Sequence, residues 1–510
     1  MAHSMDTPPA QSVEETHAEK DNVIATGEDF ETPSPARSEK LTHDGSIELN
    51  PQPSSDPNDP LNWSVLKKHL FLFIIAITAF LPDYGSSTGA ITNLVQPETW
   101  HLPETVINEA LVGNLFMLGA GGLFVVALSA YFGRLPVLFW FSIFAFLTAA
   151  WSAAATTFRS FEAARILHGF FSTVAQAGGL MFIKDIFFFH EHPRKINIWS
   201  CFIVLSPYLG PFVASWIIWK STWPWAYWIV TILWAFALIL IVSFMDETFY
   251  DRNIPRNQQP VRKSRLLRVI GVEQFHSRHL RNTFFQAISR PAIAISKVPV
   301  IIVTFYYVLT FGWVIGLNAT TGIFLKTVYH FGTESSALYF FAPMVATILG
   351  EITGHFVFDL TAKIYMKRHN GRLEPEARLL PVWFATPLMV LGIVLLGYSL
   401  QNGWHYMVTA VVWGLFVYGI IICTTAINSY LLDAYPEASG EVAAWINFGR
   451  TLGGFIITYE EVPWITAMGA RNALGIQASI VALAFGLIVI LQFFGKRLRD
   501  FSGSVHFATD

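Results

Sequence analysis

The stretch of sequence that decides the fold is residues 225–245, which read Trp-Ala-Tyr-Trp-Ile-Val-Thr-Ile-Leu-Trp-Ala-Phe-Ala-Leu-Ile-Leu-Ile-Val-Ser-Phe-Met. None of these residues is charged. A helix needs roughly 20 apolar residues to cross the ~30 Å hydrocarbon core of a bilayer. The stretch therefore predicts a membrane-spanning helix.

Eleven further apolar stretches reach a comparable length. The composition agrees, because 53% of the 510 residues are hydrophobic and only 14% are charged. We therefore expect an all-α membrane protein with twelve transmembrane helices. The predicted spans are 69–90, 106–130, 136–156, 160–184, 195–219, 225–245, 298–325, 337–361, 379–400, 405–427, 440–459 and 473–495.

A long polar segment, residues 246–297, separates the first six spans from the last six. Two six-helix halves are the repeat architecture of many secondary transporters. We expect two pseudo-symmetric bundles, at 56–245 and 298–495, joined by a cytoplasmic linker. Residues 1–55 and 496–510 are expected to be cytoplasmic tails. The first should be disordered, because its Pro, Ser, Thr, Asp and Glu cannot bury enough apolar surface.

Positive charge gathers on one side of the predicted membrane. Loops on the side of the N-terminus hold nineteen Lys and Arg, against four in the opposite loops. Such an excess marks the cytoplasmic side, so both termini are expected there. The basic residues are spread over many loops and the net charge is −3, which excludes a nucleic-acid partner. The run Arg262–Arg268 is either a basic amphipathic helix on the inner leaflet or a solvated connector.

The sequence lacks the short motifs of several enzyme classes. The sequence contains none of the motifs Gly-x-x-x-x-Gly-Lys-Ser/Thr, His-Glu-x-x-His, Cys-x-x-Cys and Gly-x-Ser-x-Gly. We therefore expect no enzyme, no cofactor and no metal, and transport driven by an ion gradient or by none. The two cysteines, Cys201 and Cys423, lie in apolar spans and are expected to be core residues.

Asp83 is a carboxylate inside the first span, in Leu81-Pro82-Asp83-Tyr84-Gly85. A charge at this depth is expensive and usually faces a cavity or a partner. Pro82 and Gly85 predict a broken helix whose free backbone groups line that cavity. The alternative is an interfacial Asp at a frayed helix end.

Glu351, His355 and Asp359 recur every four residues, so they share one face of the eighth span. Gly350 and Gly354 let another helix approach that region closely. A buried Glu beside a titratable His is a candidate proton-coupling pair or cation site. The alternative for Glu351 is a satisfied interhelical hydrogen bond, and Asp359 is expected to be structural.

Arg165 and Arg450 are the only basic residues well inside the predicted spans. Each is expected to pair with a carboxylate or with backbone carbonyls and to organise gating. The aromatic side chains of Tyr84, Trp313 and Tyr418 are candidates for cation–π contacts with a substrate.

Several motifs resemble those of the major facilitator superfamily at the matching places. Gly133-Arg134-Leu135-Pro136 resembles its conserved loop between the second and third spans. Ala130 stands where that loop usually has an Asp, so its charge-relay form is expected to be absent. Trp223-Pro224-Trp225 replaces an expected Trp-Arg-Trp. Arg165 and Gly169 match the second motif of that superfamily, and Gly210 and Pro211 match its antiporter motif. The resemblance implies the fold of the superfamily. It also implies gating or structural roles for Gly133, Arg134, Arg165, Gly210 and Pro211.

Other stretches resemble a narrower group. Residues 56–63, Asp-Pro-Asn-Asp-Pro-Leu-Asn-Trp, resemble the start of fungal twelve-span drug:proton antiporters. Asp246-Glu-Thr-Phe-Tyr-Asp-Arg252 and Asn428-Ser429-Tyr430 resemble a fungal subgroup with yeast polyamine and organic-cation (histidinol) transporters. The predicted substrate contacts are then Asp83, Tyr84, Trp313, Glu351, Tyr418 and Asn428.

These observations together imply a proton-coupled carrier of small organic cations, such as polyamines, that works by alternating access. We expect it to be a monomer in a fungal plasma membrane, with a small molecule, protons and membrane lipid as its partners. The alternative carrier is an efflux pump for drugs, toxins or a fungal secondary metabolite. An alternative of another class is a nutrient sensor that kept the fold and lost transport.

Overall fold

The computed structural model describes residues 49–252, 254, 256–260, 262–278, 281–369, 373–505 and 507. Every regular element in this part of the chain is a helix. The expected disordered tail at 1–55 lies almost wholly outside the described residues, and so does the end of the expected tail at 496–510.

The helices of the first half follow the six predicted spans. α1 runs without interruption through Pro82, so the predicted helix break beside Asp83 is wrong. Pro82 removes one backbone hydrogen bond, and the close packing of α1 against α7 outweighs that loss. The bounds are α1 Val65–Thr92, α3 Glu104–Phe132, α4 Arg134–Ala154, α5 Phe158–Ser172, α6 Val174–Ile186, α7 His192–Lys220 and α8 Pro224–Phe244, with the short η1 Pro60–Asn62, α2 Gln96–Trp100 and η2 Phe189–Glu191.

The linker between the halves contains short helices: η3 Arg256–Gln258, α9 Arg265–Ile270, α10 Val272–His276 and α11 Phe284–Ile295. α9 exposes Leu266 and Leu267, while Arg268 beside them pairs with Asp246. The basic run therefore includes a short helix with two exposed leucines, and both interpretations, a helix on the inner leaflet and a solvated connector, remain predictions. α11 packs against α3 of the first half and α18 of the second.

The helices of the second half also follow the predicted spans. α12 and α13 together form the seventh span and are separated only by Phe311. α19 runs past residue 495 to Ser502. The bounds are α12 Val298–Thr310, α13 Gly312–Tyr329, α14 Thr333–Tyr339, α15 Phe341–Arg368, η5 Pro375–Leu379, α16 Val382–Gln401, α17 Tyr406–Ala434, η6 Pro436–Ala438, α18 Ser439–Met468 and α19 Ala470–Ser502.

Within the described residues, 11 helices are long and apolar enough to cross a membrane. The span predicted at 440–459 corresponds to α18, which has 30 residues but is less apolar. It contains Glu441, Arg450, Glu460 and Glu461. α18 ends at Met468 rather than at residue 459, so the last two of these charges lie inside the helix.

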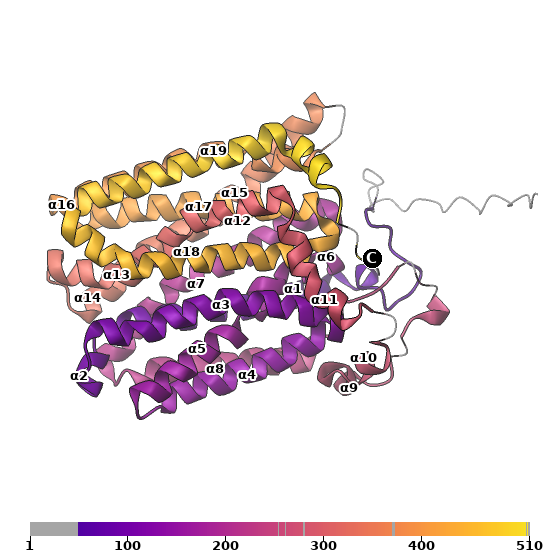
Figure 1. Cartoon of the computed structure of the whole chain (residues 1–510), viewed down its shortest axis with the longest axis horizontal. Coiled ribbons are helices and arrows are strands. Elements are labelled where there is room, and N and C mark those ends of the chain that lie inside the picture. The colour runs from indigo at the N-terminus through magenta and orange to yellow at the C-terminus, as the bar shows by residue number, and fades with distance from the viewer. Residues whose placement is uncertain are drawn as a thin grey trace, which may run out of the picture. The chain divides into compact units, whose positions relative to one another are not determined.

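The long helices run alongside one another, with the linker helices at one end of them (Figure 1). We call this the linker end, and we call the opposite end, where α2 and α14 lie, the far end. The two halves meet where α18 packs against α3 and α6, where α7 packs against α14, α15 and α17, and where α1 packs against α13. Gly119 of α3 allows one close approach, because a Cβ atom there would lie 2.1 Å from Oγ1 of Thr451 in α18.

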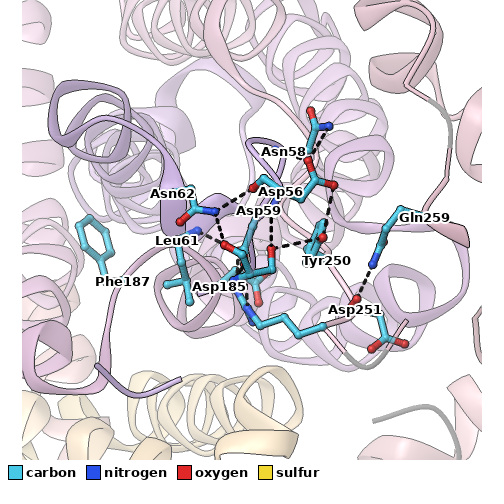
Figure 2. A network of polar contacts seen from close by, with 12 residues as sticks. Asp56, Asn58, Asp59, Leu61, Asn62, Asp185, Phe187, Tyr250, Asp251 and Gln259 are labelled. Carbon is cyan, nitrogen blue, oxygen red and sulfur yellow. Dashed lines mark hydrogen bonds and ion pairs between the residues drawn. The ribbon is translucent and has the colours of Figure 1, made fainter. Parts of the chain in front are cut away.

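The segment before α1 is fixed to the segment after α8 (Figure 2). The buried Asp59 carboxylate accepts hydrogen bonds from Arg252 Nη2 at 2.8 Å and Nε at 3.2 Å. It also accepts one from the Leu61 backbone N–H at 3.0 Å. Tyr250 donates its hydroxyl to Asp56 at 3.3 Å. Two stretches that both resembled fungal transporter motifs therefore bind each other.

Candidate functional site

A buried ion pair joins the two halves. Asp83 of α1 accepts a hydrogen bond from Nη1 of Arg450 in α18, and each side chain is only 5% exposed. Gln176 of α6 lies between them. Its Nε2 donates to Asp83 Oδ2 at 2.9 Å, and its Oε1 accepts from Arg450 Nη2 at 2.8 Å. Both charges are thus paired and hydrogen-bonded, which a buried ion pair requires.

Asn447 extends this network toward the first half. Its Oδ1 accepts from Arg450 Nη2 at 2.9 Å. Its Nδ2 donates to Oγ1 of Thr173 at 3.0 Å and to the carbonyl of Leu118 at 3.2 Å. Since Arg450 and Asn447 belong to α18 and their partners to the first half, this network must break when the halves separate here.

Arg165 of α5 supports α1 next to the ion pair. The guanidinium is buried and donates from Nη1 to the Gly85 carbonyl at 2.9 Å and from Nη2 to the Ser86 carbonyl at 3.1 Å. Its carbon Cζ lies 5.1 Å from the centre of the Tyr227 ring. The expectation that both intramembrane arginines pair with a carboxylate or with backbone carbonyls is therefore confirmed.

A small cavity lies beside Asp83 at the meeting point of the two halves. Its volume is ≈ 20 Å³, too small for an organic substrate. Two polar atoms near it, Ser86 Oγ and Asn318 Oδ1, have no hydrogen-bond partner within the described residues. The structure is therefore closed around this site. The lining residues include Asp83, Ser86 and Ser87 of α1, Leu111 of α3, Pro207 of α7 and Asn318 of α13.

Gly210 explains why α1 and α7 pack so closely beside the cavity. A Cβ atom at this position would lie 2.3 Å from Oγ of Ser87 and 2.6 Å from the Tyr84 carbonyl. Pro211 follows it and is buried in the same helix. The two residues of the predicted antiporter motif therefore lie next to α1, within two turns of Asp83.

The predicted Glu351–His355–Asp359 face lies elsewhere, where α15 meets α7. Glu351 is half-buried, and its backbone carbonyl accepts from Asn197 Nδ2 at 3.1 Å. Its Oε2 has no partner within the described residues. His355 is exposed, and its ring packs on Phe356. Asp359 pairs with Arg194 at 2.5 Å. No hydrogen bond joins Glu351 to His355 in the described part of the chain.

The predicted aromatic contacts and Asn428 are also distributed. Tyr84 stacks on Phe80 within the first half. Trp313 is buried and donates from Nε1 to the Leu309 carbonyl at 2.7 Å. Tyr418 lines an apolar groove between α15 and α17. Asn428 is buried and donates to the Thr424 carbonyl at 2.9 Å. Of the predicted substrate residues, the structure brings only Asp83 to the cavity.

The loop between α3 and α4 carries an ion pair despite Ala130. Arg134 pairs with Asp185 near the end of α6. Glu247, just after α8, accepts from the backbone N–H groups of Arg134 at 3.2 Å and Leu135 at 3.3 Å. Gly133 has φ 97°, which favours glycine. This loop therefore ties α4, α6 and the end of α8 together at the linker end.

Three residues in buried polar sites, Gln176, Asn447 and Glu461, were not predicted from the sequence. Gln176 and Asn447 are uncharged, and uncharged polar residues in a span carry no strong signal by themselves. Glu461 lies two residues beyond the predicted end of its span. A longer predicted helix would have contained the acidic pair Glu460-Glu461, and charges inside a membrane helix would have marked Glu461 as a candidate.

Comparisons with known proteins agree on one family. The sequence profile of the Major Facilitator Superfamily matches residues 63–458. "MFS transporter cpaT" of Aspergillus oryzae is 24% identical over 90% of this chain and 93% of its own length. The "Probable drug/proton antiporter YHK8" of Saccharomyces cerevisiae is 22% identical over 96% of this chain and 95% of its own. A multidrug transporter of Aspergillus fumigatus, mdrA, is 25% identical over 82% of this chain and 71% of its own.

Solved structures show the same fold. The proton:xylose symporter XylE covers 85% of this chain and 96% of its own at a TM-score of 0.59 and 15% identity. The human organic anion transporter MFSD10 covers 82% of this chain and 99% of its own at a TM-score of 0.57 and 14% identity.

Proposed function

The chain belongs to the major facilitator superfamily of membrane transporters, which are not enzymes, and we propose that it couples a proton gradient to the movement of small organic cations. It is an integral, multi-pass membrane protein with an all-helical fold. Polyamines are the favoured type of substrate. The two halves would expose the central site to one side of the membrane at a time.

The observation that carries the proposal is the ion pair between Asp83 and Arg450. A proton bound to Asp83 removes its charge and so weakens its attraction for the guanidinium. Removing one charge of a buried pair costs about 3–5 kcal/mol. That is enough to shift the equilibrium between a closed and an open arrangement of the halves by more than a hundredfold. Protonation would therefore release α18 from α1.

The same position supports the proposed preference for cations. Once α18 has moved away, Asp83 faces the enlarged cavity together with Ser86 and Asn318. An ammonium group of the substrate can then take the place of the Arg450 guanidinium. Proton and substrate would compete for one carboxylate, which couples their movements in opposite directions. The roles predicted for Glu351, His355, Tyr84, Trp313, Tyr418 and Asn428 remain predictions.

We propose that the linker end lies on the cytoplasmic side, because the basic loops lie there. We further propose that the membrane is the plasma membrane. We also propose that the chain works as a monomer, since each half already finds its partner within the same chain.

Export of drugs or of a secondary metabolite is the second candidate function. It is favoured by relatives whose names include "drug/proton antiporter" and "multidrug transporter". A cationic drug would use the same carboxylate, so the two candidates differ in the substrate and the direction of transport rather than in the coupling site.

Flux measurements in proteoliposomes test the proposal. We expect labelled spermidine to accumulate when a pH gradient is imposed, and accumulation to be lost in Asp83→Asn. Asp359→Asn is the matched control, because it removes an ion pair between the halves whose arginine is 54% exposed. It should retain most of the flux. No gradient-driven flux of any cation in a panel of polyamines and cationic drugs would refute proton-coupled cation transport.

A further inference from the structure

A second buried carboxyl group lies on α18, eleven residues beyond Arg450. Glu461 is fully buried, with 0% exposure. Its Oε1 accepts one long hydrogen bond, 3.5 Å from Nε2 of Gln477 in α19. Its Oε2 has no hydrogen-bond partner within the described residues. The proposed mechanism gives this group no role.

The neighbouring helix α13 makes room for the carboxyl group. A Cβ atom on Gly316 would lie 2.3 Å from Glu461 Oε2, so only a glycine leaves the space that this oxygen occupies. Trp313, one turn before Gly316, and Trp464, one turn after Glu461, have ring centres 6.2 Å apart. The carboxyl group is therefore enclosed between α13 and α19 beside two aromatic rings.

Within the described residues, no Lys, Arg or His pairs with the Glu461 carboxyl group. On α18, Arg450 is bound to Asp83 and the neighbouring Glu460 is exposed. Lys326 of α13 and Glu109 of α3 are also exposed. On α19 the neutral Gln477 contacts the carboxyl group, whereas Arg471 is exposed and lies 4.6 Å from the centre of the Tyr398 ring. An isolated carboxylate in such surroundings is several kcal/mol less favourable than the neutral acid. Burial at this position therefore favours the neutral acid over the carboxylate.

The position on the helix relates this group to the ion pair. Eleven residues correspond to about three helical turns, so Arg450 and Glu461 point to nearly the same side of α18, roughly 16 Å apart along its axis. Glu461 is the one nearer the far end, where α18 ends. Water that reaches Glu461 from the far end when the halves move apart there would let its proton leave.

We propose that Glu461 is a second proton-binding site, loaded in the closed protein and exchanging its proton with the far side when the halves move apart there. Its use in transport rests on the proposed proton coupling, whereas its occupation by a proton does not. Two carboxyl groups would then take part in each cycle, Asp83 centrally and Glu461 toward the far end.

Infrared difference spectroscopy of the purified full-length protein tests the occupation without any substrate. At neutral pH we expect a protonated-carboxyl band that Glu461→Gln removes and that the matched control Glu460→Gln retains. The band should shift in heavy water, because the proton exchanges when the helices open. A spectrum unchanged by Glu461→Gln, or a band that never exchanges, would overturn the proposal. If Glu461→Gln fails to fold, Gln477→Leu keeps the carboxyl group and should shift the band.

Flux measurements test the use of this proton. Glu461→Gln mimics the protonated form permanently, so we expect it to keep substrate exchange without a gradient and to lose gradient-driven accumulation. Accumulation at the wild-type level in Glu461→Gln, with loss in Asp83→Asn, would overturn the second site and leave the proposed function standing. Absence of gradient-driven flux in the wild type would instead refute the proposed function, and the infrared result would still decide whether Glu461 binds a proton.

Discussion

Asp83 and Arg450 lie 367 residues apart in the sequence and form a buried ion pair between the first and last thirds of the chain. Gln176 binds both side chains. This buried ion pair is therefore one of the contacts that hold the two halves in their closed arrangement, and its contribution can be measured.

The ion pair should behave as a strongly coupled unit. Arg450→Leu leaves the Asp83 charge buried without a cation, so we expect a loss of about 3–5 kcal/mol in the free energy of unfolding. Adding Asp83→Asn should restore about 1–3 kcal/mol, because the unpaired charge is gone. Unfolding of the purified protein in detergent measures both values. Additive effects of the two substitutions would contradict a direct pair.

Access to the cavity should depend on the same pair. A cysteine at Ser86 faces a closed cavity of ≈ 20 Å³, so a membrane-impermeant thiol reagent should label it slowly. Adding Asp83→Asn opens the contact between the halves, and labelling should become several-fold faster. The background protein carries Cys201→Ala, while the fully buried Cys423 can stay. A cysteine at the exposed Lys263 is the control and should react equally fast in both proteins.

The Asp59–Arg252 pair should stabilise the protein in a pH-dependent manner. Burial raises the pKa of Asp59, but hydrogen bonds and charge from Arg252 and the backbone N–H groups of Ser54 and Leu61 lower it more, so the folded pKa lies below 3.8. The stabilisation is therefore complete at neutral pH and is lost as the pH falls through the folded pKa.

Asp59→Asn should lower the free energy of unfolding at pH 7 by about 1–3 kcal/mol. This difference from the wild type should become smaller as the pH is lowered below 4. Arg256→Ala is the control. Arg256 is 66% exposed and 3.9 Å from Asp56, so its loss should change stability by less than about 1 kcal/mol. An equal effect of Asp59→Asn at pH 7 and pH 3 would show that its charge contributes nothing.

Gly133 should tolerate no side chain. Its φ of 97° strains any other residue by about 1–3 kcal/mol, and a Cβ atom would lie 2.8 Å from Glu247 Oε2. Gly133→Ala should therefore lower the melting temperature and loosen the contact between α4 and the end of α8. Gly332→Ala, at φ −75° with nothing within 4 Å, should leave the melting temperature unchanged. Equal melting temperatures for the two variants would contradict the strain at Gly133.

Much of the fold could be predicted from the sequence because lipid imposes a simple rule. A stretch such as 225–245 can only satisfy its backbone groups in hydrocarbon as a helix, and α8 indeed covers Pro224–Phe244. The same rule gave a wrong end for α18, because the charged residues Glu460 and Glu461 interrupt the apolar stretch at residue 459. A charged residue ends an apolar stretch in the sequence, but it does not end a helix that can bury the charge against its neighbours.

The candidate site was predicted less completely. Asp83, Arg165 and Arg450 were found because a charge inside a span is rare. Their pairing could not be predicted, since Glu351 was an equally good partner for Arg450 by sequence. Gln176 and Asn447 were missed because a neutral amide gives no such signal. Tyr84, Trp313 and Tyr418 were selected by residue type, and most aromatic residues of a membrane protein pack against their neighbours.

By itself, the sequence determined the number and order of the long helices and the rare charges inside them. These features follow from local composition, because the bilayer acts on each stretch separately. Only the tertiary structure decided that Asp83 meets Arg450, that Gly316 makes space for Glu461 and that the cavity between the halves is closed. Each of these depends on which helix faces join residues far apart in the chain, and packing of complementary surfaces, rather than the composition of any one segment, sets that choice.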